Sequence, residues 1–217
     1  MNFSTLKDYQ RLHRANFHPN LVLRTHRALS WLDRAEKADE DLDAKFIFLW
    51  ISFNACYAVD IDQQYRELEK VQFNHFFEKI VNLDSEQLIY KQLWQTFSTT
   101  IRILLDNPFV FQPFWDFHNG RISESEWTER FKNAKAKAGY ALANQDAVEV
   151  LSVLFNRLYT LRNQLMHGGA TWNSGANRDQ VRDGTKLLGT LVPIIIHIMM
   201  NHPETLWGDA HYPVVSN

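Results

Sequence analysis

The chain has 217 residues, of which 45% are hydrophobic and 13% aromatic, so it contains enough apolar material for a sizeable packed core. Its 23 lysine and arginine residues nearly balance 25 aspartate and glutamate residues, so no overall charge marks a nucleic-acid or membrane binder. The single cysteine, Cys56, excludes a disulfide framework or a cysteine metal cluster within one chain and favours a reducing, cytoplasmic compartment. The N-terminus lacks the apolar core of a signal peptide. The longest apolar runs, 46–59 and 187–200, are shorter than the ~20 residues of a membrane span, so we expect no membrane association.

The first third of the chain has helical patterns, and its scarce glycine and proline residues favour long helices over tight turns. A helix is predicted to start after Pro19 and to end in the charged turn at 36–43. In that turn, Asp41 or Asp43 is the expected N-cap of the next helix. Residues 45–60 (KFIFLWISFNACYAVD) are apolar almost all round and predict a central buried helix.

Two further helices and an aromatic connector are expected in the middle of the chain. Apolar residues recur at helical spacing across 63–83 and predict a helix there. A second helix is expected to start at Ser85 and to end near Asp106, where Asn107-Pro108 stops it. Residues 109–120 (FVFQPFWDFHNG) fit either an irregular lid or a short helix.

The last part of the chain is predicted to contain three helices. Ser123 begins the first by a capping-box pattern. Asp146 caps the second, which has a wide apolar face and ends with Gly168 as its C′ residue. The third begins at Asp179 or Gln180 and is apolar through most of its length.

These patterns predict an all-α fold of roughly six to eight helices in one bundle, because no period-two alternation or internal repeat stands out. We expect a single domain over 1–217 with its core at about 20–202. Two segments, 1–34 and 157–186, are locally basic. Solvated helix faces explain them as well as a shared cationic surface does.

The helix before Gly168 ends in the stretch RNQLMH, which places Arg162, Asn163 and His167 within six residues. At about 100° per residue, Asn163 and His167 share one face, whereas Arg162 lies about 140° from His167. Histidine is the usual general acid or base, and the guanidinium of arginine matches phosphate oxygens. A histidine at a helix C-terminus is also favoured by the helix dipole alone, so an ordinary helix end is the competing interpretation.

The chemistry that suits this stretch is one in which the nucleophile comes with the substrate, since no serine or cysteine stands within it. RNA cleavage is the obvious case. A base draws the proton from the ribose 2′-OH, which attacks the adjacent phosphate, and a cation stabilises the more anionic transition state. This reaction requires no metal and no other cofactor.

An arginine, four intervening residues and a histidine, with asparagine directly after the arginine, resemble the motif of the HEPN superfamily. The W-x-x-F-N pattern within 45–60 resembles an early helix of the Apea-like branch, and NRDQVRDG after the motif is similar to that branch as well. The resemblance therefore covers about residues 20–200. It implies a HEPN-like bundle of four to five core helices plus additional helices.

The resemblance also implies a function. Many members are metal-independent ribonucleases that act as toxins or in defence, often with an antitoxin or a nucleotidyltransferase-type partner. They commonly form homodimers in which two motif helices face each other across a two-fold axis. By this motif match Arg162, Asn163 and His167 are the catalytic residues, and Arg162 of one copy serves His167 of the other. Other members bind nucleotides or partners without cleaving RNA.

Further residues are candidates for substrate binding, each with a structural alternative. They are Asn54, Trp172, Asn173, Ser174, Arg178 and Arg182. The amide in the apolar helix either holds the motif side chains from behind or is a satisfied core group. The three loop residues either stack a base and bind phosphate or pack the loop onto the bundle. The two arginines either widen an anionic site or are solvated.

Three histidines near the C-terminus, His197, His202 and His211, raise the question of a metal site. No acidic residue stands at ligand spacing from them, and their positions along the chain point the imidazoles in different directions. We therefore predict no metal site.

Three functions remain open. The first is a metal-independent endoribonuclease with a composite arginine and histidine site at a homodimer interface. The second is a non-catalytic HEPN module that binds nucleotide, RNA or a partner protein, which the balanced charge favours. The third is a purely structural helical dimer.

Overall fold

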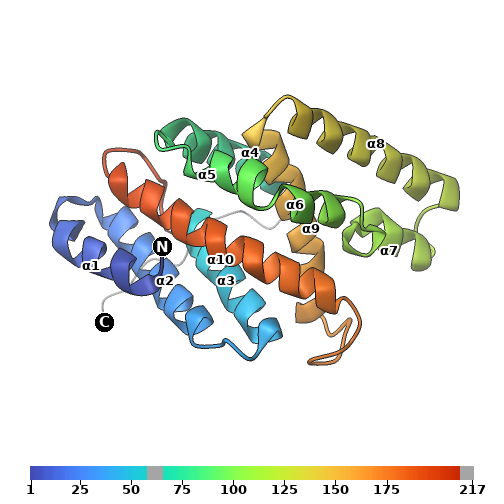
Figure 1. Ribbon diagram of the computed structural model, residues 1–217, viewed down its shortest axis with the longest axis horizontal. Helices are drawn as coiled ribbons and strands as arrows, with labels where there is room; N and C mark the ends of the chain where they lie inside the picture. The colour runs from blue at the N-terminus through green and yellow to red at the C-terminus, as the bar shows by residue number, and fades with distance from the viewer. Residues whose placement is uncertain (58–65, 211–217) are drawn as a thin grey trace. The chain divides into compact units, whose positions relative to one another are not determined.

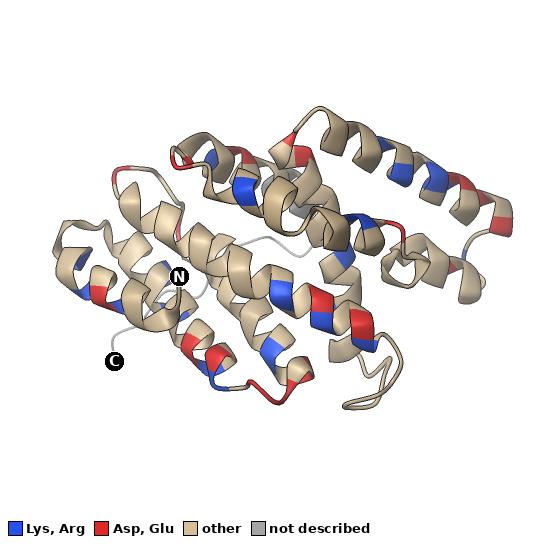
Figure 2. Cartoon of the chain, in the orientation of Figure 1, with Lys and Arg blue, Asp and Glu red and all other residues tan. Residues whose placement is uncertain are grey.

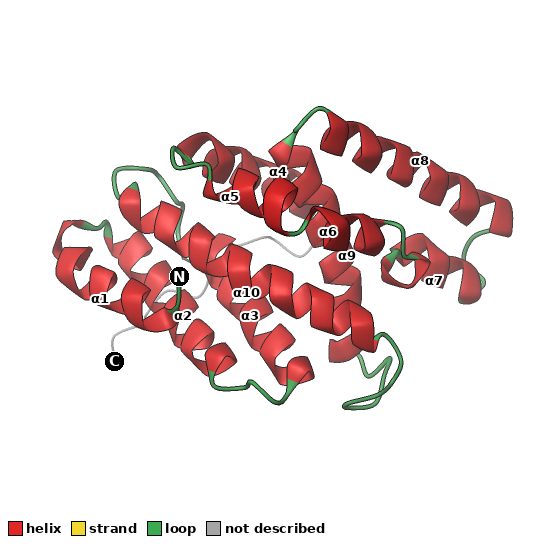
Figure 3. Ribbon diagram, viewed as in Figure 1, coloured by secondary structure: helices red, strands yellow, loops and turns green. Residues whose placement is uncertain are grey.

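Helices make up all the regular secondary structure of the residues that the computed structural model describes (Figure 3). These are the backbone of residues 1–57 and 66–210 and the side chains of residues 1–57 and 73–210. The predicted all-α helical bundle is confirmed for this part of the chain. The chain packs as two compact units, one formed by residues 1–88 with 185–217 and the other by residues 89–184.

The helices are labelled in Figure 1. The first unit contains α1 (Phe3–His13), the 3₁₀ turn η1 (Arg14–Asn16), α2 (Pro19–Glu36), α3 (Leu42–Tyr57), α4 (Arg66–Leu83) and most of α10 (Arg178–Asn201). The second unit contains α5 (Leu88–Tyr90), the π-helical η2 (Lys91–Thr96), α6 (Ser98–Leu105), the 3₁₀ turn η3 (Pro108–Val110), α7 (Gln112–His118), α8 (Glu124–Ala143), α9 (Ala147–Met166) and the first turns of α10.

The core of the first unit forms where α2 packs along α3. Leu29 of α2 and Phe46 of α3 are fully buried, and the Ser52 hydroxyl donates to the carbonyl of Ala28 at 2.7 Å, which ties the two helices together. Phe53 of α3 stacks on Phe77 of α4 with ring centroids 6.1 Å apart. These contacts explain why α3 is apolar on nearly every face: helices cover it on more than one side.

The core of the second unit forms around α9, against which α6, α8 and η3 pack. Leu154, Leu158 and Leu161 of α9 are fully buried, as the predicted apolar face requires. The predicted cap of α9 is confirmed, because Asp146 Oδ1 accepts a hydrogen bond from the Glu149 N–H at 3.0 Å. This unit carries the end of α9 and the whole RNQLMH stretch.

The helix α10 begins in the second unit and continues into the first. By length and composition it is the one helix among the described residues that is apolar enough to cross a membrane. However, 72% of its apolar window is buried inside the structure, as in a core helix.

The N-terminal helix α1 was not predicted from the sequence. The Asn2 side chain accepts a hydrogen bond from the Thr5 N–H at 3.1 Å, and the Thr5 hydroxyl in turn lies 3.4 Å from the Asn2 N–H. This reciprocal capping box starts the helix, and Leu6 and Gln10 are its buried contacts. Two buried side chains in eleven residues gave too weak an apolar pattern to reveal it.

The single helix predicted from Ser85 to near Asp106 is wrong in its start and its continuity. Gln87 adopts a left-handed φ of 55°, so the helical conformation begins only at Leu88. A π-helical segment then ends at Phe97, whose N–H bonds to the carbonyl of Gln92 five residues back at 2.9 Å. The segment is thus divided into α5, η2 and α6.

Other predicted helix boundaries are confirmed or made more precise by the structure. Asp41, one of the two proposed caps of α3, accepts from the Ala44 N–H at 3.0 Å. The aromatic connector contains the short helix α7, with Pro113 in its first turn. The predicted start of α4 at Gln63 lies outside the described residues. The prediction of a single domain stays a prediction.

Candidate functional site

The end of α9 turns away from the helix axis through two adjacent glycines. Gly168 has a left-handed φ of 69°, which confirms it as the C′ residue, and its N–H points to the carbonyl of Leu165 at 3.4 Å. The Gly169 N–H bonds to the carbonyl of Gln164 at 2.7 Å, and a Cβ on Gly169 would lie only 3.0 Å from that oxygen. Both glycines are therefore required for this tight turn, which leaves the end of α9 exposed to solvent.

The motif side chains occupy this exposed end. Arg162 is half-buried, its Nη1 donates to Asn163 Oδ1 at 2.9 Å, and its guanidinium lies 5.9 Å from the centre of the Tyr159 ring. The His167 backbone closes the helix by donating to the carbonyl of Asn163 at 3.0 Å. The His167 imidazole is exposed and makes no hydrogen bond or ion pair with any residue that the structure describes.

The structure brings Arg162 to Asn163 but does not bring Arg162 to His167. No hydrogen bond joins the guanidinium and the imidazole within the described chain, in agreement with their separation of about 140° around the helix. Asn163 uses its side-chain oxygen to fix one of the five N–H donors of the guanidinium. The end of α9 therefore carries the accessible imidazole of His167 on one side and the guanidinium of Arg162, oriented by Asn163, on another.

The loop that follows carries three of the predicted substrate-binding residues. The Trp172 side chain is 74% exposed, and Asn173 has a left-handed φ of 52°. Ser174 serves the turn: its hydroxyl accepts from the Ala176 N–H at 3.1 Å, and its carbonyl accepts from Arg178 Nε at 3.2 Å. Arg178 thus holds the loop to the start of α10.

Arg182, the second predicted arginine of α10, is held by two carboxylates. Its Nη1 lies 2.7 Å from Asp179 and its Nε 3.2 Å from Asp183, and the hydrogen bond to Asp183 is the main cause that raises the pKa of Arg182 above its usual value. Acidic and basic segments alternate on the first turns of α10 in Figure 2. These ion pairs offset the charge of Arg182, which favours the alternative that this arginine is part of a solvated helix face.

Gln164 is the residue of the motif that the sequence analysis missed. Its Nε2 donates to the carbonyl of Phe109 at 2.6 Å, and its Oε1 accepts from Asn177 Nδ2 at 2.6 Å. Its backbone carbonyl also accepts from Gly169. Gln164 therefore links the motif helix to both the aromatic connector and the loop 169–177. An amide at the end of an apolar helix was the only sequence signal for this role.

The aromatic connector covers a second arginine of α9. Arg157 is buried, with its guanidinium 4.2 Å from the centre of the Phe111 ring and 5.5 Å from that of Phe131 on α8. Its Nη2 donates to the carbonyl of Leu105 at 3.3 Å, whereas its Nε is buried without a hydrogen-bond partner among the described residues. Burial lowers the pKa of Arg157 to about 10, which leaves it charged at neutral pH.

Asn54, the candidate from the apolar helix α3, lies in the first unit, whereas the motif lies in the second. Its Oδ1 is buried and has no hydrogen-bond partner among the residues that the structure describes. The predicted role of Asn54 behind the motif stays a prediction.

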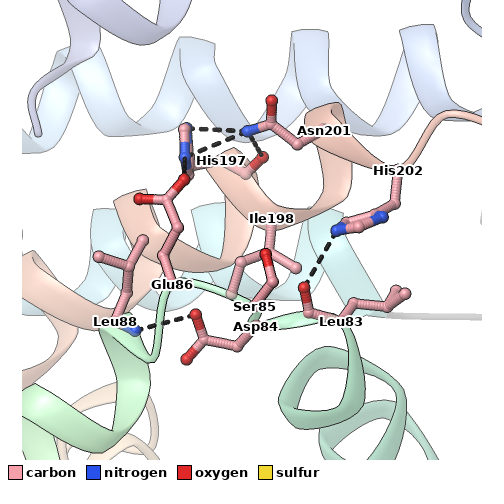
Figure 4. A pocket seen from close by; sticks show the side chains of 9 residues that line it. All are labelled: Leu83, Asp84, Ser85, Glu86, Leu88, His197, Ile198, Asn201 and His202. Carbon is pink, nitrogen blue, oxygen red and sulfur yellow. Dashed lines mark hydrogen bonds and ion pairs between the residues drawn. The ribbon is translucent and has the colours of Figure 1, made fainter.

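A shallow, open hollow in the first unit is lined by two of the C-terminal histidines (Figure 4). His197 Nε2 lies 3.8 Å from Glu86 Oε1, and His202 Nε2 lies 3.0 Å from the carbonyl of Leu83. Tertiary folding thus supplies an acidic neighbour that sequence spacing did not reveal. The described residues contain no group of three side chains arranged to hold a metal ion, and His211 lies outside them.

Comparison of the chain with models of known protein families, with curated proteins and with solved structures gives no match. The function of the chain is therefore inferred from its residues and their geometry. Their arrangement offers a proton acceptor, a cation and exposed aromatic surface at one end of α9.

Proposed function

We propose that the chain is a metal-independent endoribonuclease of the HEPN type, with Arg162, Asn163 and His167 as its catalytic residues. The observation that carries this proposal is the exposed imidazole of His167, which has no partner among the described residues, at a helix end that also presents a guanidinium oriented by Asn163. An accessible proton acceptor and an oriented cation, both carried by one helix end, are the groups that phosphodiester transesterification needs. The sequence resemblance to the HEPN motif supports the same assignment.

The separation of Arg162 from His167 favours a site made by two copies of the chain. Within one copy the two side chains lie about 140° apart around α9, so they serve a single phosphate poorly. A two-fold axis near the end of α9 would place the Arg162 of one copy near the His167 of the other. The exposed side chain of Met166, 51% accessible, supplies apolar surface for such a contact.

The reaction follows from these groups. His167 takes the proton of the ribose 2′-OH, and the 2′ oxygen forms a bond to the adjacent phosphorus as the bond from phosphorus to the 5′ oxygen breaks. The guanidinium of Arg162 stabilises the extra negative charge on the phosphate oxygens. The imidazolium of the second copy protonates the leaving 5′ oxygen. The products are a 2′,3′-cyclic phosphate and a 5′-hydroxyl end.

A non-catalytic module that binds nucleotide, RNA or a partner protein is the second candidate. It is favoured by the weak basic character of the site, because the two carboxylates around Arg182 remove one of the few cations near the motif. RNA-binding proteins usually present a stronger basic surface. The two candidates differ in whether His167 is needed.

Expression of the wild type and of His167→Ala side by side tests the proposal. We expect growth arrest and RNA fragments with the wild type only, in the manner of a toxin. With purified protein, cleavage should persist in EDTA and leave cyclic-phosphate ends. The Tyr140→Ala variant is a control, because Tyr140 is also exposed, at 72%, but lies on α8, seven residues before α9 begins and far along the chain from the motif.

Intact RNA after incubation with the dimeric wild type would contradict the ribonuclease and favour the binding module. Nucleotide or RNA binding that is unchanged in His167→Ala would then support that second candidate. Fragmentation by both wild type and His167→Ala would instead remove the imidazole from the mechanism.

A further inference from the structure

We propose that Phe109 and Trp172 are stacking surfaces for unpaired bases of the RNA, and that Gln164 is the positioning residue that holds both beside His167. This inference rests on the proposed ribonuclease function and extends it to how the substrate is held. It assigns a role to the aromatic connector, whose function could not be predicted from the sequence.

Gln164 is placed to couple these parts because it lies between Asn163 and His167 on α9. Residues three apart on a helix are neighbours, with about 5–6 Å between their Cβ atoms. The two hydrogen bonds of the Gln164 amide, both 2.6 Å long, therefore form beside the His167 side chain. They leave the amide with its oxygen and one N–H engaged and its orientation fixed.

Phe109 is an exposed aromatic residue on a rigid backbone. Its ring is 45% exposed, yet its N–H donates to Asn107 Oδ1 at 2.8 Å. Its carbonyl accepts from both Gln164 Nε2 at 2.6 Å and Trp115 Nε1 at 2.8 Å. The ring also packs edge-on against Phe114, with centroids 5.4 Å apart. Three hydrogen bonds and a ring contact thus hold a solvent-facing phenyl group in one place.

Trp172 lies on a loop whose two ends are bonded to the same residue. Gly169 at one end donates to the Gln164 backbone carbonyl at 2.7 Å, and Asn177 at the other end donates to the Gln164 side chain at 2.6 Å. Trp172, which is 74% exposed, therefore lies on a loop closed on Gln164. Phe109 and the loop of Trp172 are both held by one residue, Phe109 by the Gln164 side chain and the loop by its side chain and its backbone carbonyl.

An unpaired nucleotide is the occupant that fits this arrangement. Aromatic faces bind bases of any sequence by stacking, provided that the base is not already stacked in a duplex. In the proposed dimer, the Arg162 guanidinium of the second copy faces the His167 side of α9 and complements the phosphate, so aromatic surface and positive charge occur together as a single strand requires. We expect the bases that flank the cleaved phosphate to lie on these two rings.

Binding is best measured in a His167→Ala background, so that cleavage does not consume the probe. The probes are a fluorescent single-stranded RNA of about 12 nucleotides, within the site sizes of single-strand binders, and the matching RNA duplex. Phe109→Ala and Phe109→Leu should each weaken single-strand binding about tenfold, whereas Phe109→Trp should retain it. Duplex binding should be weaker than single-strand binding and unaffected by these changes.

Gln164→Glu tests the positioning role. The carboxylate still accepts from Asn177 but has no N–H for the carbonyl of Phe109. In the otherwise wild-type enzyme we expect the KM for single-stranded RNA to rise about tenfold with kcat little changed, since the catalytic groups are intact. Gln112→Ala is the matched control, because it removes an exposed glutamine that bonds to Asp116 at 3.1 Å in the same segment.

The outcomes separate this inference from the ribonuclease proposal. The stacking role would be overturned, and the ribonuclease function left standing, if the wild type cleaves RNA but the KM values of the test variants do not rise. The test variants are Phe109→Leu and Gln164→Glu, and their KM values are compared with those of the controls Tyr140→Ala and Gln112→Ala. Single-strand binding that depends on Phe109 without any cleavage would support the stacking role and overturn the ribonuclease. A dimer that loses assembly in Phe109→Leu would show that a second copy covers the ring instead. Thermal melting of each variant identifies loss of folding, and Phe109→Leu then replaces Phe109→Ala.

Discussion

Two arginines five residues apart on α9 differ in their surroundings, one buried in the core of the second unit and the other near the exposed end of the helix. Arg157 is enclosed by Phe111 and Phe131, and burial lowers its pKa. Arg162 is half-buried near the solvent-exposed end of α9 and is held by the amide of Asn163. The same residue type on the same helix thus acts as part of a core in one place and as an available cation in the other.

The difference between Arg157 and Arg162 means that charge alone does not identify a functional residue. A guanidinium between aromatic rings stabilises the packing of the aromatic connector and α8 on α9, and its charge is shielded from any substrate. A guanidinium with one fixed hydrogen bond keeps its remaining donors for a ligand. Variants at Arg157 and at the end of α9 should therefore separate effects on stability from effects on activity.

The largest expected effect is the loss of activity in His167→Ala. Removal of a general base typically lowers a rate by about 10²–10⁴-fold, and we expect RNA cleavage to fall by this factor. Because the imidazole is exposed, the melting temperature should stay within experimental error. Initial rates on labelled RNA and thermal melts check the two halves of this prediction, and a large drop in melting temperature would show that His167 is structural.

The next largest effect is on stability, at Arg157. Arg157→Ala should lower the free energy of unfolding by about 2–4 kcal/mol, since it leaves a cavity between the rings. Arg157→Met keeps the volume without the buried charge and should be neutral or stabilising. Urea unfolding of both variants tests this order. Equal destabilisation by the two substitutions would mean that the charge itself, and not the packing, holds the segment.

In the first unit, Cys56 is a second ionisable group whose pKa is changed by burial, as is that of Arg157. Its thiol is buried, and burial raises its pKa to about 12, although the Arg24 guanidinium acts in the opposite direction. Because the folded pKa lies above the usual value, the protonated thiol contributes stability fully below about pH 9, and that contribution is lost as the pH rises towards 12. We expect the stability difference between wild type and Cys56→Ala to shrink over this range. Denaturant melts at several pH values measure it, and a thiol reagent should label the folded wild type only slowly at neutral pH.

The smallest expected effect is at the start of α10. The double substitution Asp179→Asn with Asp183→Asn removes both carboxylates from Arg182 without changing the size of the side chains. RNA binding should tighten a few-fold at low salt, and the slope of log K against log salt should steepen by about one. Filter binding across a salt series checks both, and an unchanged slope would place Arg182 outside the RNA path.

Much of the fold could be predicted because it follows from local patterns. The apolar face of α9, its cap Asp146 and its C′ residue Gly168 are all set by neighbouring residues, and all three predictions are confirmed. The break at Phe97 was missed because a π-helical hydrogen bond leaves no mark in the apolar periodicity. The helix α1 was missed because its first turn depends on a capping box between Asn2 and Thr5, and not on an apolar face.

The candidate site was predictable only in part, because it depends on contacts between distant segments. The motif residues were recognisable as a pattern at a helix end, yet the bond from Gln164 to Phe109 spans 55 positions. The carboxylates around Arg182 stood in the sequence at helical spacing, and their consequence became clear only from the distances. Local chemistry can be read from one segment, whereas the surroundings that tune it come from tertiary structure.

The double anchorage of loop 169–177 on Gln164 has a consequence for protein engineering. Gly169 and Asn177 fix the two ends of this loop, and both lie outside the tetrapeptide 172–175. Alternative tetrapeptides that keep Ser174, whose hydroxyl accepts from the Ala176 N–H, should retain the turn and, under the proposed function, change target preference. Such a library would make the loop after α9 a position at which binding preference can be selected.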